Sequence, residues 1–219
     1  MKVILFGATG MVGQGVLREC LIDDGIEQVL VVGRSPSDPS HPKLTEVIHG
    51  DFLDYSSIEP QLAGFDACFF CLGVSSIGMD EERYRRITHD FTLAAATTLA
   101  RLNPQMTFVY VTAIGTDSTE QGSVMWARVK GKTENDLFKL PFKAVHVLRP
   151  GIIQPLHGAR SRTSWVPAFY AVTGPLWSLL RRLAPGLVTS TEQIGRAMIR
   201  IAREGYPDKV LEMRAINSL

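Results

Sequence analysis

Three glycines near the amino terminus have a spacing that suits diphosphate binding. Gly7, Gly10 and Gly13 follow the apolar run 3–6 in the pattern GxxGxxG and precede an amphipathic segment. Gly7 permits a sharp turn, Gly10 lets main-chain N–H groups approach a diphosphate at the positive end of a helix, and Gly13 lets that helix lie close to the strand. The pattern predicts a dinucleotide-binding loop, with a glycine turn kept only for packing as the alternative. The other expected ligands in this loop are Ala8, Thr9, Met11 and Val12.

The end of the second apolar run indicates which dinucleotide this loop would take. In such sites an acidic residue at that position binds the ribose 2′-hydroxyl, whereas an arginine accepts a 2′-phosphate. The run 29–32 leads into Gly33, Arg34 and Ser35, with no Asp or Glu at its tip. Arg34 offers a bidentate guanidinium and Ser35 a hydroxyl. We therefore predict NADP(H) as the cofactor, the alternative for Arg34 being a solvated loop residue.

Two later turns are expected to complete the same site. Asp51 and Phe52 follow the third apolar run, where a carboxylate and the adjacent backbone would hold the adenine edge. The alternative for Asp51 is a cap for the helix near Tyr55. Leu72 and Gly73 end the fourth run, and Gly73 either lets the backbone pass close to the cofactor or is an ordinary loop glycine.

A parallel sheet is the element that would bring these turns together. Apolar runs alternate with helical patterns, and their apolar residues are consecutive, as in strands covered by helices on both faces. The fold class predicted is therefore α/β, a doubly wound parallel sheet. The expected strands are 3–6, 29–32, 44–48, 67–72, 107–112 and 144–148, and the main expected helices are 81–101, 126–140 and 191–204.

The pattern changes after residue 150, and we expect residues 151–219 to add a small cap to one domain spanning 1–219. This region contains a predicted apolar helix near 176–183 and a short strand near 210–213. An aromatic and basic segment within it would line a pocket for an apolar or aromatic substrate or form a homodimer surface, in preference to membrane contact. Its members are Trp165, Phe169, Tyr170, Leu176, Trp177, Leu179, Leu180, Arg181 and Arg182.

The amino-acid composition indicates which binding partners, compartment and metal sites to expect. The 219 residues carry a formal charge of +1, with 45% hydrophobic and 21% charged residues, so a folded protein without a nucleic-acid partner is expected. Three cysteines cannot all pair, and the chain starts on a strand rather than a signal peptide, which predicts a reducing cytoplasm. Cys68 and Cys71 have the spacing of a redox or metal pair but are expected to be buried in a strand, and the histidines show no metal-ligand spacing.

Several motifs taken together resemble the atypical short-chain dehydrogenase/reductase superfamily over nearly the whole chain. The resemblance implies a Rossmann-like fold that binds NADP(H), with a small carboxyl-terminal substrate region. It also places Pro150 among the cofactor ligands. Members of this superfamily include reductases, epimerases and redox-sensing regulators. The motifs that carry it are residues 7–13, Cys71-Leu72-Gly73, Val111-Thr112-Ala113-Ile114-Gly115, Val129-Lys130-Gly131-Lys132-Thr133-Glu134 and Leu148-Arg149-Pro150-Gly151.

The chain departs from the catalytic pattern of that superfamily. The pattern pairs a tyrosine with a lysine four residues later, so that the lysine lowers the phenol pKa and the tyrosine transfers a proton. Here Lys130 is present, but Trp126 stands in the place of the tyrosine, and Thr112 represents the usual serine. An indole only donates a hydrogen bond. Lys130 is therefore expected to bind the nicotinamide ribose, while Trp126 is either a flat wall of the site or part of the core.

Two function classes follow from these observations. The first is a reductase that transfers hydride from NADPH to a flat or conjugated small molecule, with Lys130 and Thr112 as the expected catalytic residues and water as the proton source. The second is a non-catalytic protein that responds to NADP(H) by ordering its cap. The absence of the tyrosine favours the second class, whereas Lys130 and the apolar tail favour the first, which we prefer.

Overall fold

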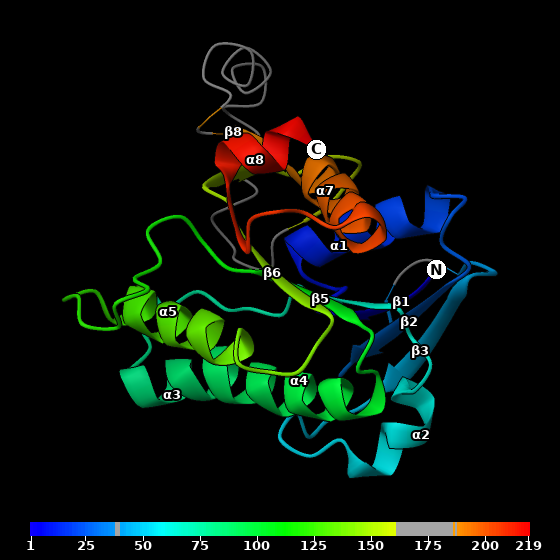
Figure 1. Cartoon of the computed structure of the whole chain (residues 1–219), viewed down its shortest axis with the longest axis horizontal. Coiled ribbons are helices and arrows are strands. Elements are labelled where there is room, and N and C mark those ends of the chain that lie inside the picture. Colours follow the sequence, from blue (N-terminus) through cyan, green and yellow to red (C-terminus); the bar gives the residue numbers. More distant parts are fainter. Residues whose placement is uncertain (38–39, 161–185, 187) are drawn as a thin grey trace.

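A parallel seven-stranded sheet forms the centre of the molecule (Figure 1). The structure is a computed structural model that describes residues 1–37, 40–160, 186 and 188–219. The strand order is β3-β2-β1-β4-β5-β6-β9, and every pair is parallel. This order confirms the predicted α/β, Rossmann-like fold. The strands are β1 (Lys2–Phe6), β2 (Gln28–Gly33), β3 (Leu44–Ile48), β4 (Ala67–Phe70), β5 (Thr107–Val111), β6 (Ala144–Arg149) and β9 (Val210–Glu212).

Helices cover both faces of this sheet, as Figure 1 shows. Alternate residues of β1 divide between the two cores: Val3 and Leu5 pack on one side, and Ile4 and Phe6 on the other. This division explains why the strands read as continuous apolar runs. One face carries α1 (Met11–Ile22), α7 (Thr191–Glu204) and α8 (Met213–Ser218). The other carries the 3₁₀ turn η1 (Ser56–Ile58), α2 (Glu59–Leu62), α3 (Glu81–Arg85), α4 (Phe91–Leu102) and α5 (Met125–Leu137).

The helix expected at 81–101 forms, but its middle is a π-helical turn. This turn, η2 (Arg86–Asp90), joins α3 to α4. His89 lies within it, and its ring nitrogens contact Asp90 Oδ1 at 2.8 Å and Asp136 Oδ2 of α5 at 2.9 Å. These contacts tie the α3–α4 unit to α5 and so help to fix the position of α5 at the sheet.

Helices α1 and α7 pack closely because both contribute glycines to the contact. A Cβ on Gly15 would lie 2.4 Å from Thr191 Cβ, and one on Gly195 would lie 2.7 Å from Glu19 Cγ. The buried carboxylate of Glu19 accepts a hydrogen bond from Arg196 of α7 at 3.2 Å. Helix α1, which follows the glycine loop, is thus held by the carboxyl-terminal part of the chain.

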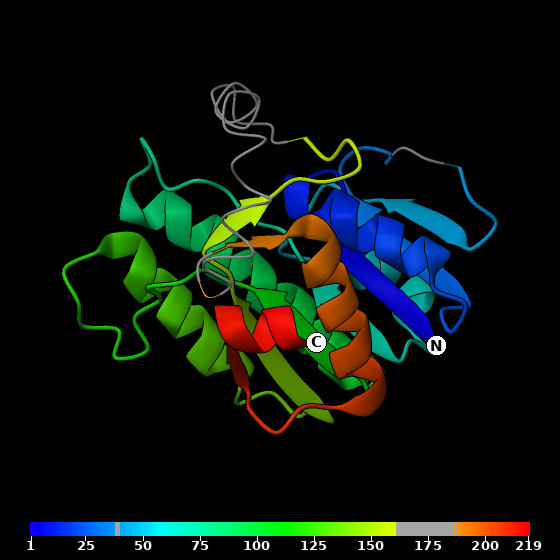
Figure 2. The ribbon, with the colours of Figure 1, turned by 90° about the horizontal axis from the view of Figure 1, so that it is seen from above.

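Residues 151–219 do more than cover the sheet. The terminal strand expected near 210–213 is β9, which pairs with β6 in the main sheet. A separate ribbon consists of β7 (Ile152–Gln154) and β8 (Val188–Ser190), which lie side by side in Figure 2. The aromatic and basic segment 165–182 and the apolar helix expected near 176–183 fall outside the described residues. Among the helices that are described, none combines the length and apolar character needed to cross a bilayer.

Candidate cofactor site

The glycine loop between β1 and α1 is shaped by main-chain contacts that exclude side chains. Gly7 has a φ of +81°, and a Cβ there would lie 2.6 Å from the Leu72 nitrogen. The Gly10 N–H donates to the Gly7 carbonyl at 2.9 Å. A Cβ on Gly13 would lie only 2.0 Å from the same carbonyl oxygen, so the first helical turn rests on the loop itself. Gly7 and Gly13 are therefore required by the geometry of the turn.

The amino terminus of α1 is open to an anion. Gly10 is the N-cap, and within the described structure no side chain caps this helix and no acidic residue lies in its first turn. The first N–H groups of a helix lack intrahelical acceptors, and the helix dipole makes this end positive. A diphosphate would supply the missing acceptors, so this end of α1 fits the expected cofactor.

A small hollow of about 50 Å³ adjoins the loop and is lined by half of the expected cofactor ligands. It lies where the carboxyl ends of β1, β2 and β4 meet, the usual ligand position in open α/β sheets. Sequence reasoning missed Val31, Val32 and Gly33, although their place at the end of the second strand was a usable signal. The expected residues that line the hollow are Gly7, Ala8, Thr9, Arg34, Ser35, Phe52 and Leu72.

Arg34 is available for an anionic ligand at the rim of this hollow. It is exposed, and its guanidinium has no ion-pair partner in the described part of the chain. Ser35 is half-buried beside it. A free guanidinium next to a hydroxyl suits a phosphate group.

Asp51 and Gly73 do not line the hollow beside the glycine loop. Asp51 is exposed, and its carboxylate accepts the Leu53 N–H at 2.9 Å, so it caps a turn, while its neighbour Phe52 lines the hollow. Asp54, and not Asp51, caps the turn at Ser56, at 2.8 Å. A Cβ on Gly73 would meet no heavy atom within 4 Å, so packing does not require glycine there.

Lys130 lies on the second turn of α5, against the end of β5. Its Nζ lies 5.9 Å from the centroid of the Tyr110 ring. Burial lowers the pKa of Lys130 to about 8, although the Glu134 carboxylate acts in the opposite direction. An ammonium in this setting is costly to the fold unless a ligand uses it.

The Thr112 hydroxyl is already engaged within its own loop. Thr116 donates its hydroxyl hydrogen to the Ala113 carbonyl at 2.7 Å, and the Thr112 and Thr116 oxygens are 2.9 Å apart. Thr112 must therefore be the donor to Thr116, which leaves it only as an acceptor toward a ligand. The Pro150 carbonyl accepts the Ile114 N–H at 2.9 Å, so Pro150 holds this loop in place.

No phenol replaces the missing tyrosine within the described residues near Lys130. Tyr84 and Tyr110 are each 1% exposed, and burial raises the pKa of both hydroxyls. Neither can exchange a proton with a substrate in solution. Trp126 is half-buried, and a Cβ on Gly115 would lie 3.5 Å from its indole Cη2, so the indole packs beside the loop that follows β5.

Two residues from the recognised motifs pair with each other. Arg149 donates through Nε to the buried Glu134 carboxylate at 3.2 Å and also reaches Ser118 Oγ at 2.6 Å. A third partner is Glu212 of β9, at 3.4 Å. Arg149 thus joins α5, the loop after β5 and the last strand, which positions the helix that carries Lys130.

Residues 7–139, more than half of the chain, match the family described as NAD(P)H-binding. The chain belongs to this family. A curated relative, "Protein fmp52, mitochondrial" of Emericella nidulans, is 26% identical over 90% of this chain and 85% of its own length. Rat "Protein HTATIP2" is 26% identical over 69% of this chain and 62% of its own length. The Bordetella bronchiseptica enzyme WbmF, solved with NAD⁺, superposes with a TM-score of 0.70 at 18% identity, over 99% of this chain and 76% of its own.

These findings confirm the Rossmann fold and membership of an NAD(P)H-binding family, and the likeness of fold extends to a solved short-chain dehydrogenase family protein. They contradict one expectation, the cytoplasmic location, because several fungal relatives are named as mitochondrial proteins. Unpaired cysteines indicate a reducing environment but do not identify the compartment. All three cysteines are indeed free, and Cys20 and Cys68 are buried in the core.

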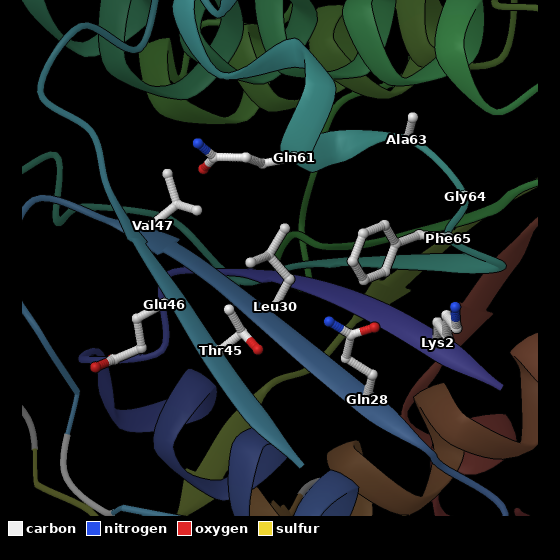
Figure 3. Close-up of a pocket in the computed structure, with 10 residues that line it drawn as sticks. All are labelled: Lys2, Gln28, Leu30, Thr45, Glu46, Val47, Gln61, Ala63, Gly64 and Phe65. Carbon is white, nitrogen blue, oxygen red and sulfur yellow. The ribbon is translucent and has the colours of Figure 1, made fainter. Parts of the chain in front are cut away.

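A second hollow of about 350 Å³ lies at the opposite end of the sheet (Figure 3). Lys2 and Gln28, the first residues of β1 and β2, stand at its edge, with Leu30 and Phe65 between them and α2. It contains none of the expected cofactor residues. Within the described residues, no group of His, Cys, Asp or Glu side chains could hold a metal ion.

Proposed function

We propose that this protein uses NADP(H) to reduce a flat or conjugated small molecule. The free guanidinium of Arg34 beside the glycine loop is the observation that carries the choice of NADP(H). The glycine loop and the start of α1 would hold the diphosphate, and Lys130 would bind the nicotinamide ribose. When bound, the reduced nicotinamide supplies a hydride. A conjugated acceptor suits this site because its reduced form takes its proton from water, so no phenolic acid is needed.

Exposed apolar residues around the site support an apolar substrate. Val74 and Ile77 follow β4, Ile114 and Val124 follow β5, and Ile152 follows β6. All five are large, and Ile77 is 77% exposed. Four of them lie on loops that leave the carboxyl ends of the strands, where a Rossmann fold binds its substrate, and Ile152 begins β7 after the end of β6. Large apolar side chains exposed at this edge of the sheet suit contact with an apolar ligand.

A non-catalytic NADP(H)-responsive protein is the second candidate. Trp126 in place of the tyrosine and the burial of Tyr84 and Tyr110 favour it, because they leave no phenolic acid among the described residues of the site. The names of the fungal relatives favour a mitochondrial location for either function. A homodimer, and the absence of nucleic-acid and membrane partners, remain predictions from the sequence.

The substitution Arg34→Gln tests the choice of cofactor. It should weaken NADPH binding by about 10- to 100-fold, because it removes a charge-assisted contact worth about 1.5–3 kcal/mol. NADH affinity should stay within about twofold, since NADH lacks the 2′-phosphate. Calorimetric titration of both cofactors gives the ratio. An unchanged NADPH-to-NADH affinity ratio would refute the role assigned to Arg34.

Turnover separates the two candidate functions. Purified protein should oxidise NADPH in the presence of at least one quinone, flavin or enone. The loss of absorbance of the reduced cofactor measures this reaction. The variant Trp126→Tyr should also speed reduction of a simple ketone by about 10²-fold, because a phenol near Lys130 restores acid catalysis. Trp126→Phe is the matched control, with a ring but no acid. Wild-type protein that is inert toward every acceptor, beside an active Trp126→Tyr variant, would establish the non-catalytic alternative.

A further inference from the structure

A glutamine on the first turns of α1 connects the glycine loop to the segment after β7. The Gln14 side-chain amide donates to the Thr9 carbonyl at 3.0 Å and to the Arg160 carbonyl at 3.1 Å. Its oxygen accepts the Arg160 N–H at 3.0 Å. Both hydrogens of the amide and its oxygen are therefore used, and they fix the Arg160 backbone beside the loop.

Two other contacts anchor the segment that leads to Arg160. The Leu156 N–H donates to Thr191 Oγ1 at 3.1 Å, and His157 Nε2 lies 2.6 Å from Glu192 Oε2. Both partners belong to the first turn of α7, the helix that packs closely on α1. In Figure 2 this yellow segment runs past the blue start of α1. The position of Arg160 is thus set by the same two helices that hold the glycine loop.

The glycine loop lacks a basic side chain of its own to balance the charge of a bound diphosphate. Residues 7–13 include no basic side chain, although a dinucleotide diphosphate carries two negative charges. Arg18 on the same helix is paired with Glu19. Arg160 is exposed, and its guanidinium makes no ion pair with any described residue. The backbone of Arg160 is hydrogen-bonded to the Gln14 side chain, which also bonds the Thr9 carbonyl of the glycine loop.

We infer that Arg160 is a ligand of the cofactor diphosphate, and that Gln14 positions it. This inference rests on the proposed binding of NADP(H). Arg34 and Arg160 then bind different phosphate groups of the cofactor. Arg34 binds the 2′-phosphate, and Arg160 binds the diphosphate that NADH and NADPH share. The carboxyl-terminal region would contribute to affinity without affecting the choice between the two cofactors.

Calorimetric titration of four ligands tests this division. Arg160→Gln should weaken NADPH, NADH and 5′-ADP each by about 5- to 30-fold, the effect of one charge-assisted contact, and leave 2′-AMP within about twofold. Arg34→Gln should weaken NADPH and 2′-AMP and spare NADH and 5′-ADP. Gln14→Met should reproduce the Arg160→Gln pattern, and the double variant Gln14→Met/Arg160→Gln should bind no more weakly than Arg160→Gln alone.

The control for net charge is Arg200→Gln, which removes a cation that pairs with Glu204 on α7. It should leave all four affinities within about twofold, and thermal melts confirm that each variant folds. If Arg160→Gln spares 5′-ADP and NADH, or weakens 2′-AMP equally, the inference is wrong while the proposed function stands. If the folded wild-type protein binds none of the four ligands, the proposed function itself fails.

Discussion

The substitution Lys130→Met is expected to stabilise the fold and to weaken NADPH binding at the same time. The pKa of Lys130 is lowered from 10.5 to about 8 because the ammonium is desolvated. Each unit of such a shift corresponds to about 1.4 kcal/mol, so an apolar side chain of similar length should raise the free energy of unfolding by about 1–3 kcal/mol. NADPH affinity should fall about tenfold, since the ribose loses its cationic partner.

The pH dependence of this stabilisation has a definite sign. Between pH 8 and 10.5 the unfolded chain binds a proton at Lys130 that the folded chain has lost, so raising the pH favours the folded state. The advantage of Lys130→Met should therefore be largest below pH 8 and shrink as the pH rises toward 10.5. The NADPH affinity of the wild type should decline as the pH passes about 8. Urea denaturation and calorimetric titration over pH 6–10 would measure both effects.

Lys132→Met is the matched control on the same helix. Lys132 is 43% exposed and pairs with Asp136 at 3.0 Å, so its loss should neither stabilise the fold nor change NADPH affinity. A Lys130→Met variant that is destabilised, or that binds NADPH as well as the wild type does, would show that Lys130 serves packing and not the cofactor.

The substitution Gly13→Ala is expected to disrupt the glycine loop. The new methyl group would lie 2.0 Å from the Gly7 carbonyl oxygen, and relief requires the main chain of the loop to move. Overpacking of this kind costs about 1–3 kcal/mol, with larger values where backbone is involved. NADPH affinity should fall by about 100-fold or more, because the displaced N–H groups no longer converge on the diphosphate.

Two other glycines serve as controls for Gly13. A Cβ on Gly10 would come no closer than 3.3 Å to the Gly7 carbonyl oxygen, and one on Gly50 would meet no atom within 4 Å. Gly10→Ala should therefore cost less than about 1 kcal/mol of stability, and Gly50→Ala should change neither stability nor affinity. Urea denaturation and NADPH titration compare the three variants. Wild-type affinity in Gly13→Ala would show that the loop does not bind the cofactor.

The elements that local patterns define were predictable. Each of the six apolar runs expected to be a strand forms one, and so does the short strand expected near 210–213. Consecutive apolar residues separated by helices fit a sheet that is buried on both faces. The carboxyl ends of parallel strands share one edge, so Arg34, Phe52 and Leu72 could be assigned to one site before their distances were known. The family membership likewise follows from short motifs.

The use of each polar group depended on contacts that only the folded chain shows, whether the partner is near or distant in the sequence. Thr112 loses its free hydrogen to Thr116, Asp51 turns back on Leu53, and Tyr110 is buried beneath Lys130. Gln14 carries no sequence signal, yet it joins the glycine loop to a residue 146 positions away.

The sequence by itself therefore determined the fold, the family and the position of the glycine loop, since these follow from local periodicity, short motifs and glycine spacing. Only the tertiary structure decided which donors, acceptors and charges remain free for a ligand. The physical reason is that desolvation and hydrogen-bond saturation depend on packing in three dimensions.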